Sequence, residues 1–384
     1  MKKTALTRSL ILGLLLLAIP VQLFPSVLIV VDVKAEENSW TTLTPMSTPR
    51  ASFDAAVVDG KIYAIGGTSR VTEEYDPVTN TWTTKAAVPT GRYSLVTVAV
   101  QNKIYAIGGY DDEQVGTPIG KNEVYDPATD NWVTKTEMPT ARGQMCANTV
   151  NGQIYVIGGL EWVGYYQVEE SNKTEAYNPA TNTWITKAEM PYAAADVSSV
   201  VVGDKIYVLS SPIQIYDIKT DSWSIGSFPP EEQSDADAVT ISDEQGRELI
   251  YIFGGGEKLI YSDLVQIYDP ENDVWGVGSH MPTPRRGLAV VVVKNQIYAL
   301  GGATCGGGDG VLGTLVSANE RYTPLESGSM LPSPSPEPTT PTSPTPLPSE
   351  EPQQLIQEVI LGVAITLAVI GVGLGLLLYL IKRK

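Results

Sequence analysis

Two charged residues recur at fixed distances from the tryptophans and tyrosines of this chain. An arginine stands ten residues after four of the tryptophans, and a glutamate stands two residues before four of the tyrosines. In six successive copies of this spacing, the first position holds Arg50, Arg92, Arg142, Ala194, Gln233 and Arg285, and the second holds Glu73, Glu123, Glu175, Gln214, Gln266 and Glu320. Both charges are lost together in the fourth and fifth copies. Because a half-buried charge without its partner is costly, this joint loss predicts an arginine–glutamate pair within each of the other copies.

The same four arginines, Arg50, Arg92, Arg142 and Arg285, also allow a second interpretation. A ring of guanidinium groups on one surface forms a cationic patch that binds an acidic ligand. The sequence alone leaves pairing and ligand binding open.

Aromatic residues form the other candidate binding group. They lie in segments of variable length that follow glycine pairs, and Asp111, Asp112 and Glu113 accompany the first of them. The candidate residues are Tyr110, Trp162, Tyr165, Tyr166 and Tyr261. Aromatic rings beside carboxylates suit the recognition of sugars or peptides, although exposed rings also pack against neighbouring loops.

Several classes of chemistry are disfavoured by composition. A single histidine, His280, cannot form a multi-histidine metal site, and the two cysteines, Cys146 and Cys305, are too few for a thiolate cluster. The sequence contains no nucleophile elbow, no phosphate-binding glycine loop and no serine–histidine arrangement. We therefore predict no metal, no cofactor and no catalytic residue.

The residues that would position these groups belong to a short repeated stretch, an apolar run that ends in a glycine pair. Each run is too short for a helix and rich in β-branched and aromatic residues, so it predicts a strand buried on both faces. The six copies are 62–67, 104–109, 154–159, 206–211, 250–255 and 297–302, the fourth ending in Ser210-Ser211.

Each copy is flanked by further strand and turn signals. A two-residue turn such as Asp59-Gly60 precedes most copies, and a Tyr-Asp-Pro turn followed by a tryptophan, as in Tyr75 to Trp82, comes after most of them. The unit is therefore four antiparallel strands repeated about every 40 to 50 residues, which is typical of a propeller blade.

The glycine pair, the Tyr-Asp-Pro turn and the tryptophan, in this order and spacing, resemble the kelch family. The resemblance implies an all-β fold, a six-bladed kelch-type β-propeller over residues 36–326. It also implies that arginines of such domains can bind acidic peptides. Copper oxidases of this family need more than one histidine ligand, so that activity is not expected here.

Closure of the ring is predicted from one irregularity. The last copy lacks its tryptophan, because Ser329 occupies the expected position, whereas Trp40 stands upstream of the first copy. An N-terminal strand that carries Trp40 would complete the last blade and remove the free sheet edges.

The ends of the chain predict export and membrane anchoring. Residues 1–35 resemble a secretory signal peptide, with an uncleaved N-terminal anchor as the alternative. Residues 327–354 are rich in proline, serine and threonine and predict an extended stalk. Residues 355–384 contain the apolar stretch Val359 to Ile381 and a basic tail, which predict a single transmembrane helix with a cytoplasmic C-terminus and the propeller outside the cell membrane.

Charge and architecture together give three candidate functions. The net charge of −17 predicts that nucleic acid is not a partner. The first candidate is a cell-surface module, displayed on a stalk, that binds an extracellular protein or glycan. The second is a sugar epimerase or mutarotase similar to the kelch-type sialate mutarotases, for which an unpaired arginine and glutamate in the channel would be the sign. The third is a structural component of the cell envelope, for which an apolar patch on the outer wall would be the sign.

Overall fold

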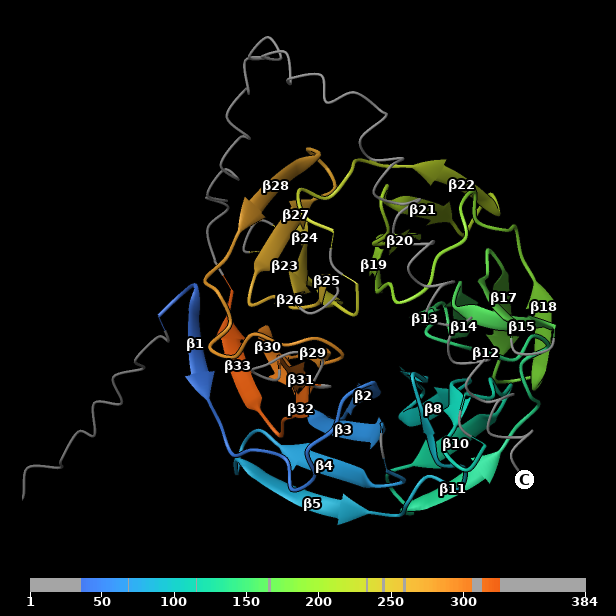
Figure 1. Cartoon of the computed structure of the whole chain (residues 1–384), viewed down its shortest axis with the longest axis horizontal. Helices are drawn as coiled ribbons and strands as arrows, with labels where there is room; N and C mark the ends of the chain where they lie inside the picture. Colours follow the sequence, from blue (N-terminus) through green and yellow to red (C-terminus); the bar gives the residue numbers. More distant parts are fainter. Residues whose placement is uncertain are drawn as a thin grey trace, which may run out of the picture.

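Six β-sheets stand around a central axis in the computed structural model of the chain, as the blades of a propeller do (Figure 1). The structure describes residues 36–67, 69–114, 116–164, 167–232, 234–243, 246–257, 260–305 and 313–324. Within these ranges six sheets have four antiparallel strands each, and no helix occurs. The predicted all-β propeller is confirmed.

The first three blades each use four strands that follow one another along the chain, interrupted only by short strands in the loops. Blade 1 contains β2 (Phe53–Val58), β3 (Lys61–Gly66), β4 (Thr72–Asp76) and β5 (Thr81–Lys85); blade 2 contains β7 (Val96–Val100), β8 (Lys103–Ile107), β10 (Asn122–Asp126) and β11 (Asn131–Thr134); blade 3 contains β13 (Cys146–Val150), β14 (Gln153–Ile157), β17 (Thr174–Asn178) and β18 (Thr183–Thr186).

The next two blades repeat this order, and the last takes its outermost strand from the other end of the chain. Blade 4 contains β19 (Ser199–Val202), β20 (Lys205–Val208), β21 (Gln214–Asp217) and β22 (Ser222–Ile225); blade 5 contains β23 (Asp237–Ser242), β24 (Glu248–Phe253), β27 (Val265–Asp269) and β28 (Val274–Val277); blade 6 contains β29 (Ala289–Val293), β30 (Gln296–Leu300), β33 (Asn319–Thr323) and β1 (Ser39–Thr42). Blade 4 forms although Ser210-Ser211 replaces its glycine pair.

The second strand of each blade is the apolar repeat, and it is buried on both faces as predicted. Ile62, Ala64 and Ile65 of β3 are fully buried between blades 6 and 2. The innermost strands contact one another in a closed series, from β2 through β7, β13, β19, β23 and β29 back to β2. The hydrophobic core is therefore a ring of interfaces between blades.

Strand β1 closes this ring. Trp40 of β1 is paired with Tyr322 of β33, in the same relation in which Trp82 is paired with Tyr75 inside blade 1. Figure 1 shows β1 at the outer edge of blade 6, beside β33. The predicted closure by an N-terminal strand is confirmed.

The tryptophans also join neighbouring blades. The indole N–H of Trp82 donates a hydrogen bond to the carbonyl of Thr44, which lies in the loop that ends blade 6, at 2.9 Å. The indole N–H of Trp40 donates in the same way to the carbonyl of Ser279, at the end of blade 5, at 2.9 Å. Trp40 thus acts both within blade 6 and across its boundary with blade 5.

The predicted signal peptide (1–35), stalk (327–354) and transmembrane segment (355–384) lie outside the described residues. In the part of the chain that the structure describes, no helix is long and apolar enough to cross a membrane.

Replacing Trp40 by Ala should weaken the ring at its closure. The substitution removes the indole contacts with Phe253 and Tyr322 and the hydrogen bond to Ser279. We expect the free energy of unfolding, measured by urea denaturation, to fall by about 2 to 3 kcal/mol, because loss of a large aromatic side chain from a packed site costs this order of energy. Val133→Ala, at a half-exposed position on β11, is the control and should change it little. Equal effects of the two substitutions would contradict a closing role for Trp40.

Candidate functional site

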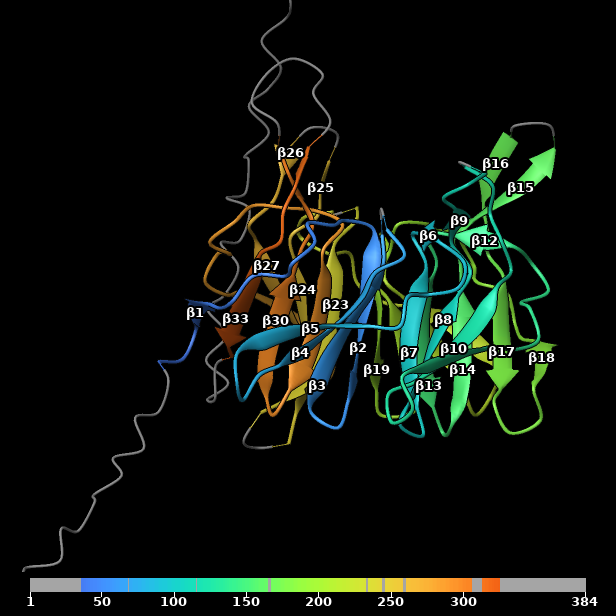
Figure 2. The ribbon, with the colours of Figure 1, turned by 90° about the horizontal axis from the view of Figure 1, so that it is seen from below.

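The loops that follow the glycine pairs all lie on one side of the ring, which we call the loop face. Figure 2 shows two hairpins that project from this face, one formed by β15 (Leu160–Gly164) and β16 (Gln167–Glu170) and one by β25 (Gly256–Glu257) and β26 (Ile260–Tyr261). Five further short strands lie in the loops of this face. β6 (Arg92–Tyr93) pairs with β9 (Tyr110–Asp111), β12 (Arg142–Gly143) pairs with β15, and β31 (Ala303–Thr304) pairs with β32 (Thr314–Leu315).

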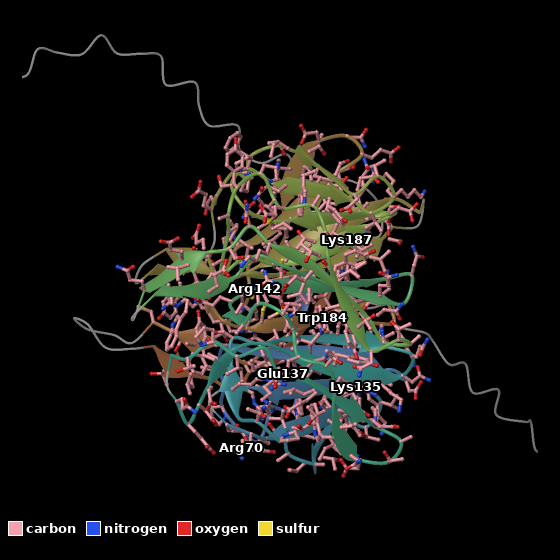
Figure 3. All side chains as sticks on the ribbon, turned by 90° about the vertical axis from the view of Figure 1, so that its right-hand side faces the viewer. Arg70, Lys135, Glu137, Arg142, Trp184 and Lys187 are labelled. Atoms are coloured by element: carbon pink, nitrogen blue, oxygen red, sulfur yellow. The ribbon has the colours of Figure 1, made fainter. Side chains whose placement is uncertain are left out.

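The four repeated arginines are buried and ion-paired inside their blades. All four have 0% exposure, and each contacts the glutamate of its own repeat. The Arg92 and Glu123 side chains approach to 2.9 Å, and those of Arg142 and Glu175 approach to 2.7 Å. Figure 3 places Arg142 within the body of the ring and Arg70 at its margin. The predicted pairing is therefore present.

This burial corrects the alternative in which Arg50, Arg92, Arg142 and Arg285 form a cationic surface patch. Each guanidinium also donates to at least one backbone carbonyl: Arg142 Nη1, for example, lies 2.8 Å from the oxygen of Gly158. Desolvation by burial lowers the pKa of Arg142, and the Glu175 carboxylate opposes this effect. These side chains hold the loops to the blades and are not presented to a ligand.

In blades 4 and 5 a glutamine, in place of the arginine–glutamate pair, attaches the loop to the blade. The Gln214 amide accepts the N–H of Tyr192 at 2.9 Å and donates to the carbonyl of Tyr192 at 3.0 Å. The Gln266 amide binds the N–H and the carbonyl of Glu231 in the same way, at 3.2 and 3.0 Å. An amide both donates and accepts, so it anchors the loop without an arginine. We call this contact the glutamine clamp; Gln233 lies outside the described residues.

The predicted aromatic residues divide into different environments. Tyr110 is buried, stacks on Tyr93 with ring centroids 5.3 Å apart, and donates its hydroxyl to Gln144 at 3.0 Å. Tyr261 is half-buried beneath the Arg286 guanidinium, 4.8 Å from the ring centroid. Trp162 of β15 is 44% exposed. Tyr165 and Tyr166 lie outside the described residues.

The loop face carries two further exposed aromatic side chains that the sequence analysis did not select. Tyr192, in the loop from β18 to β19, is 57% exposed, and Phe228, in the loop from β22 to β23, is 66% exposed. Both loops are held to their blades by glutamine clamps. Gln214 binds the backbone of Tyr192 itself, and Gln266 binds the backbone of Glu231, three residues after Phe228. The signal for Tyr192 in the sequence was its replacement of the repeated threonine, as in Thr90 and Thr140, two residues before the arginine position. Phe228 has no such signal, because Glu231 occupies the equivalent position in blade 5.

These aromatic residues share their loops with acidic side chains. Val163 and Val168 are exposed beside Trp162 on the β15–β16 hairpin. Five exposed glutamates lie on the same three segments: Glu169, Glu170, Glu189, Glu231 and Glu232. The loop face over blades 3 to 5 is therefore aromatic and acidic.

The central channel opens at the same face, and a belt of backbone hydrogen bonds surrounds its opening. One residue of each blade, in the left-handed conformation, donates its N–H to the carbonyl of the equivalent residue of the preceding blade, at 2.7 to 3.1 Å. The belt residues are Ser52, Ser94, Gln144, Asp196, Asp235 and Gly287. The last bond, from Ser52 to Gly287, completes the circle.

A chain of side-chain contacts runs along half of this opening. The Tyr110 hydroxyl donates to Gln144, and Gln144 Nε2 donates to Asp196 Oδ2 at 2.8 Å. The carboxyl of Asp196 shares a hydrogen bond with that of Asp235, and Asp235 lies 3.7 Å from Arg286 Nε. Burial and the charge of Asp235 raise the pKa of Asp196 to about 7. The Asp196 carboxyl beside Asp235 therefore keeps its proton at a higher pH than an ordinary aspartate does.

The stabilising effects of Arg142 and Glu175 should depend on each other. We expect Arg142→Met and Glu175→Gln each to destabilise the fold, because each leaves an uncompensated buried partner. The double variant leaves no unpaired charge in the interior. The sum of the two single losses in the free energy of unfolding, measured by urea denaturation, should therefore exceed the loss in the double variant by about 2 kcal/mol. Additive effects would mean that Arg142 does not depend on Glu175.

The Asp196–Asp235 pair should make stability fall as pH rises. A carboxyl whose pKa is about 7 when folded and about 4 when unfolded binds more protons in the folded state between these values, so the free energy of unfolding declines from pH 5 to pH 8. Asp196→Asn keeps a residue that tolerates the left-handed conformation and removes one charge. We expect this variant to be more stable than the parent at pH 8, by about 1 kcal/mol, and nearly unchanged at pH 5.

Thermal unfolding at the two pH values measures this difference. Asp204→Asn, at an exposed hairpin turn on the opposite face, is the matched control. A stabilisation of Asp196→Asn that is the same at pH 5 and pH 8 would refute the raised pKa of Asp196.

Comparisons with known proteins agree with this geometry. The family described as the KLHDC2/KLHL20/DRC7 kelch-repeats domain matches residues 24–211. Kelch-like protein 35 of Mus musculus is 28% identical over 36% of this chain and 24% of its own length, and beta-scruin of Limulus polyphemus is 25% identical over 35% and 15%. The chain thus matches less than a third of either relative.

A solved structure, that of YjhT, has the same fold. It superposes with a TM-score of 0.62 at 18% identity and covers 73% of this chain and 96% of its own. Together with the six sheets, the repeated glycine pairs and the closure by β1, these matches show that the chain is a kelch-type β-propeller.

Proposed function

We propose that this chain is a cell-surface binding module whose loop face recognises an extracellular protein or glycan. The signal-like residues 1–35, the proline-rich residues 327–354 and the apolar stretch Val359 to Ile381 support anchoring in the cell membrane with the propeller outside. A stalk of this kind would hold the rigid ring away from the membrane, where its surface is accessible to a partner.

One observation carries the proposal: the segments of the loop face over blades 3 to 5 carry exposed aromatic side chains. Trp162, Tyr192 and Phe228 are between 44% and 66% exposed, on a paired hairpin and on two loops held by glutamine clamps. Aromatic side chains on well-held backbone lose little conformational entropy on binding, and they dominate the energy of many interfaces.

The acidic charge of the loop face restricts which partners it can bind. Five glutamates, Glu169, Glu170, Glu189, Glu231 and Glu232, lie on the same segments, whereas the repeated arginines are buried. A neutral or basic partner therefore fits this surface better than an acidic one. This argument also weakens the expectation of an acidic peptide that the family resemblance raised.

The two other candidate functions have less support. An epimerase or mutarotase would be favoured by an unpaired arginine and glutamate in the channel, and the described residues that line it include neither type. A structural role would be favoured by an apolar patch on the outer wall. The described outer strands expose single apolar side chains on separate blades, Val133, Ile185, Ile225 and Val274, and such isolated residues are ordinary on soluble surfaces.

Binding should depend on the aromatic residues of the loop face. We expect the full-length chain, purified in detergent, to bind members of a combined glycan and peptide array. Trp162→Ala and Phe228→Ala should each lower the affinity for the selected ligand at least tenfold, because the loss of an aromatic anchor typically costs more than 1 kcal/mol. Val78→Ala, at an 81% exposed position on the opposite face, is the matched control. Binding that survives both substitutions would place recognition elsewhere.

A further inference from the structure

The channel contains a polar chamber just below the belt. Its volume is about 250 Å³, slightly below the range of pockets for drug-sized ligands, so it suits a small molecule. Four carboxyl groups line it, from Asp54 of β2, Asp196, Asp235 and Asp237 of β23. A wider cavity of about 390 Å³ continues along the axis and shares Thr97, among others, with the chamber.

These carboxyl groups lack sufficient positive charge around them. No lysine or arginine is among the described residues that line the chamber, and Arg286 Nε approaches Asp235 Oδ2 to 3.7 Å from outside this lining. Burial and the charge of Asp237 raise the pKa of Asp54 to about 8, and burial raises that of Asp237 to about 6. The groups that act on Asp196 are Asp235, Gln144, Arg286 and, more weakly, Tyr110.

Two of the four carboxylates accept backbone N–H groups from the next blade. Asp54 accepts the backbone N–H of Thr97 in the next blade, at 2.5 Å, and Asp237 accepts that of Val290, at 2.6 Å. Asp196 and Asp235 stand at belt positions where blades 1 and 2 have Ser52 and Ser94, so the belt itself does not require a carboxylate there. Residues that destabilise a fold without serving it are typical of functional sites.

A second, independent feature points into the chamber. Thr97 is only 6% exposed, and it is among the residues that line both cavities. Its hydroxyl lies beside the Asp54 carboxyl and makes no hydrogen bond of good geometry within the described structure. A buried hydroxyl without a partner is uncommon, and a ligand in the chamber can supply that partner.

The chemical class of the ligand follows from the spacing of the carboxylates. A small metal ion needs several ligands converging on one point, and no group of three or more acidic, histidine or cysteine side chains in the described residues could hold one. An organic ammonium ion instead has several N–H donors and is long enough to reach acceptors that lie apart. The four aspartates, which come from blades 1, 4 and 5, suit such a ligand.

We propose that the chamber is a binding site for a small organic cation that carries one or two primary ammonium groups, with Asp196 and Asp235 at its entrance and Asp54, Asp237 and Thr97 below. Each ammonium donates hydrogen bonds to a carboxylate pair and offsets its charge. The site is separate from the aromatic surface of the loop face, so either can be present without the other.

Calorimetric titration of the full-length chain in detergent tests the proposal. The probes are ethanolamine, 1,3-diaminopropane and spermidine, and the neutral controls are N-acetylethanolamine and 1,3-propanediol. We expect at least one ammonium probe to bind at pH 8, at least tenfold more tightly than the neutral compounds. Binding should weaken at pH 5, because the pKa values of about 6 to 8 leave the carboxyl groups protonated there.

Variants separate the chamber from non-specific attraction by an acidic protein. Asp196→Asn, which should fold well, and Asp54→Asn should each lower the affinity for the bound probe at least tenfold, whereas Asp204→Asn on the opposite face should leave it unchanged. The proposal is overturned if no ammonium probe binds, if neutral and ammonium compounds bind equally, or if Asp196→Asn binds as the parent chain does.

Discussion

The belt of backbone hydrogen bonds around the channel is the constraint on which the rest of the ring depends. Six residues must occupy equivalent places in six blades, and the last bond, from Ser52 to Gly287, exists only because blade 1 meets blade 6. At the outer edge of blade 6 the same two ends of the chain meet again, because β1 carries Trp40 into pairing with Tyr322 of β33. The blades of such a ring therefore depend on one another, because the belt and the closing strand both join the first blade to the last.

The contacts behind the belt can vary, provided that each loop remains attached to its blade. Four blades use a buried arginine and glutamate, whereas blades 4 and 5 use the amides of Gln214 and Gln266. Removal of one charge alone would leave the other unpaired in the interior, which explains why both changed together. The two blades without the ion pair are also those whose loops carry Tyr192 and Phe228, so a change in the interior accompanies a change in the surface that is presented.

The repeat predicted most of the architecture, because strands buried on both faces and fixed turns leave strong local patterns. The pairing of Arg142 with Glu175 was also accessible, since its signal was a correlation among copies of one chain. The channel carboxylates were not recognised, because Asp196 and Asp235 form a pair only after two successive blades place them side by side. Likewise, Tyr110 looks like a surface aromatic in sequence, and only the stacking on Tyr93 explains its burial.

The channel and the loop face place different demands on the same fold. Serine at Ser52 and Ser94 satisfies the belt, so nothing in the backbone explains two adjacent carboxyl groups at Asp196 and Asp235. Such a pair weakens the folded state above the pKa at which Asp196 loses its proton, because two like charges then face each other away from bulk water. A binding partner that supplies positive charge removes this penalty only while it is bound. The cost to stability and the capacity to bind a cation therefore have the same physical origin, which is charge that the ring encloses and does not itself neutralise.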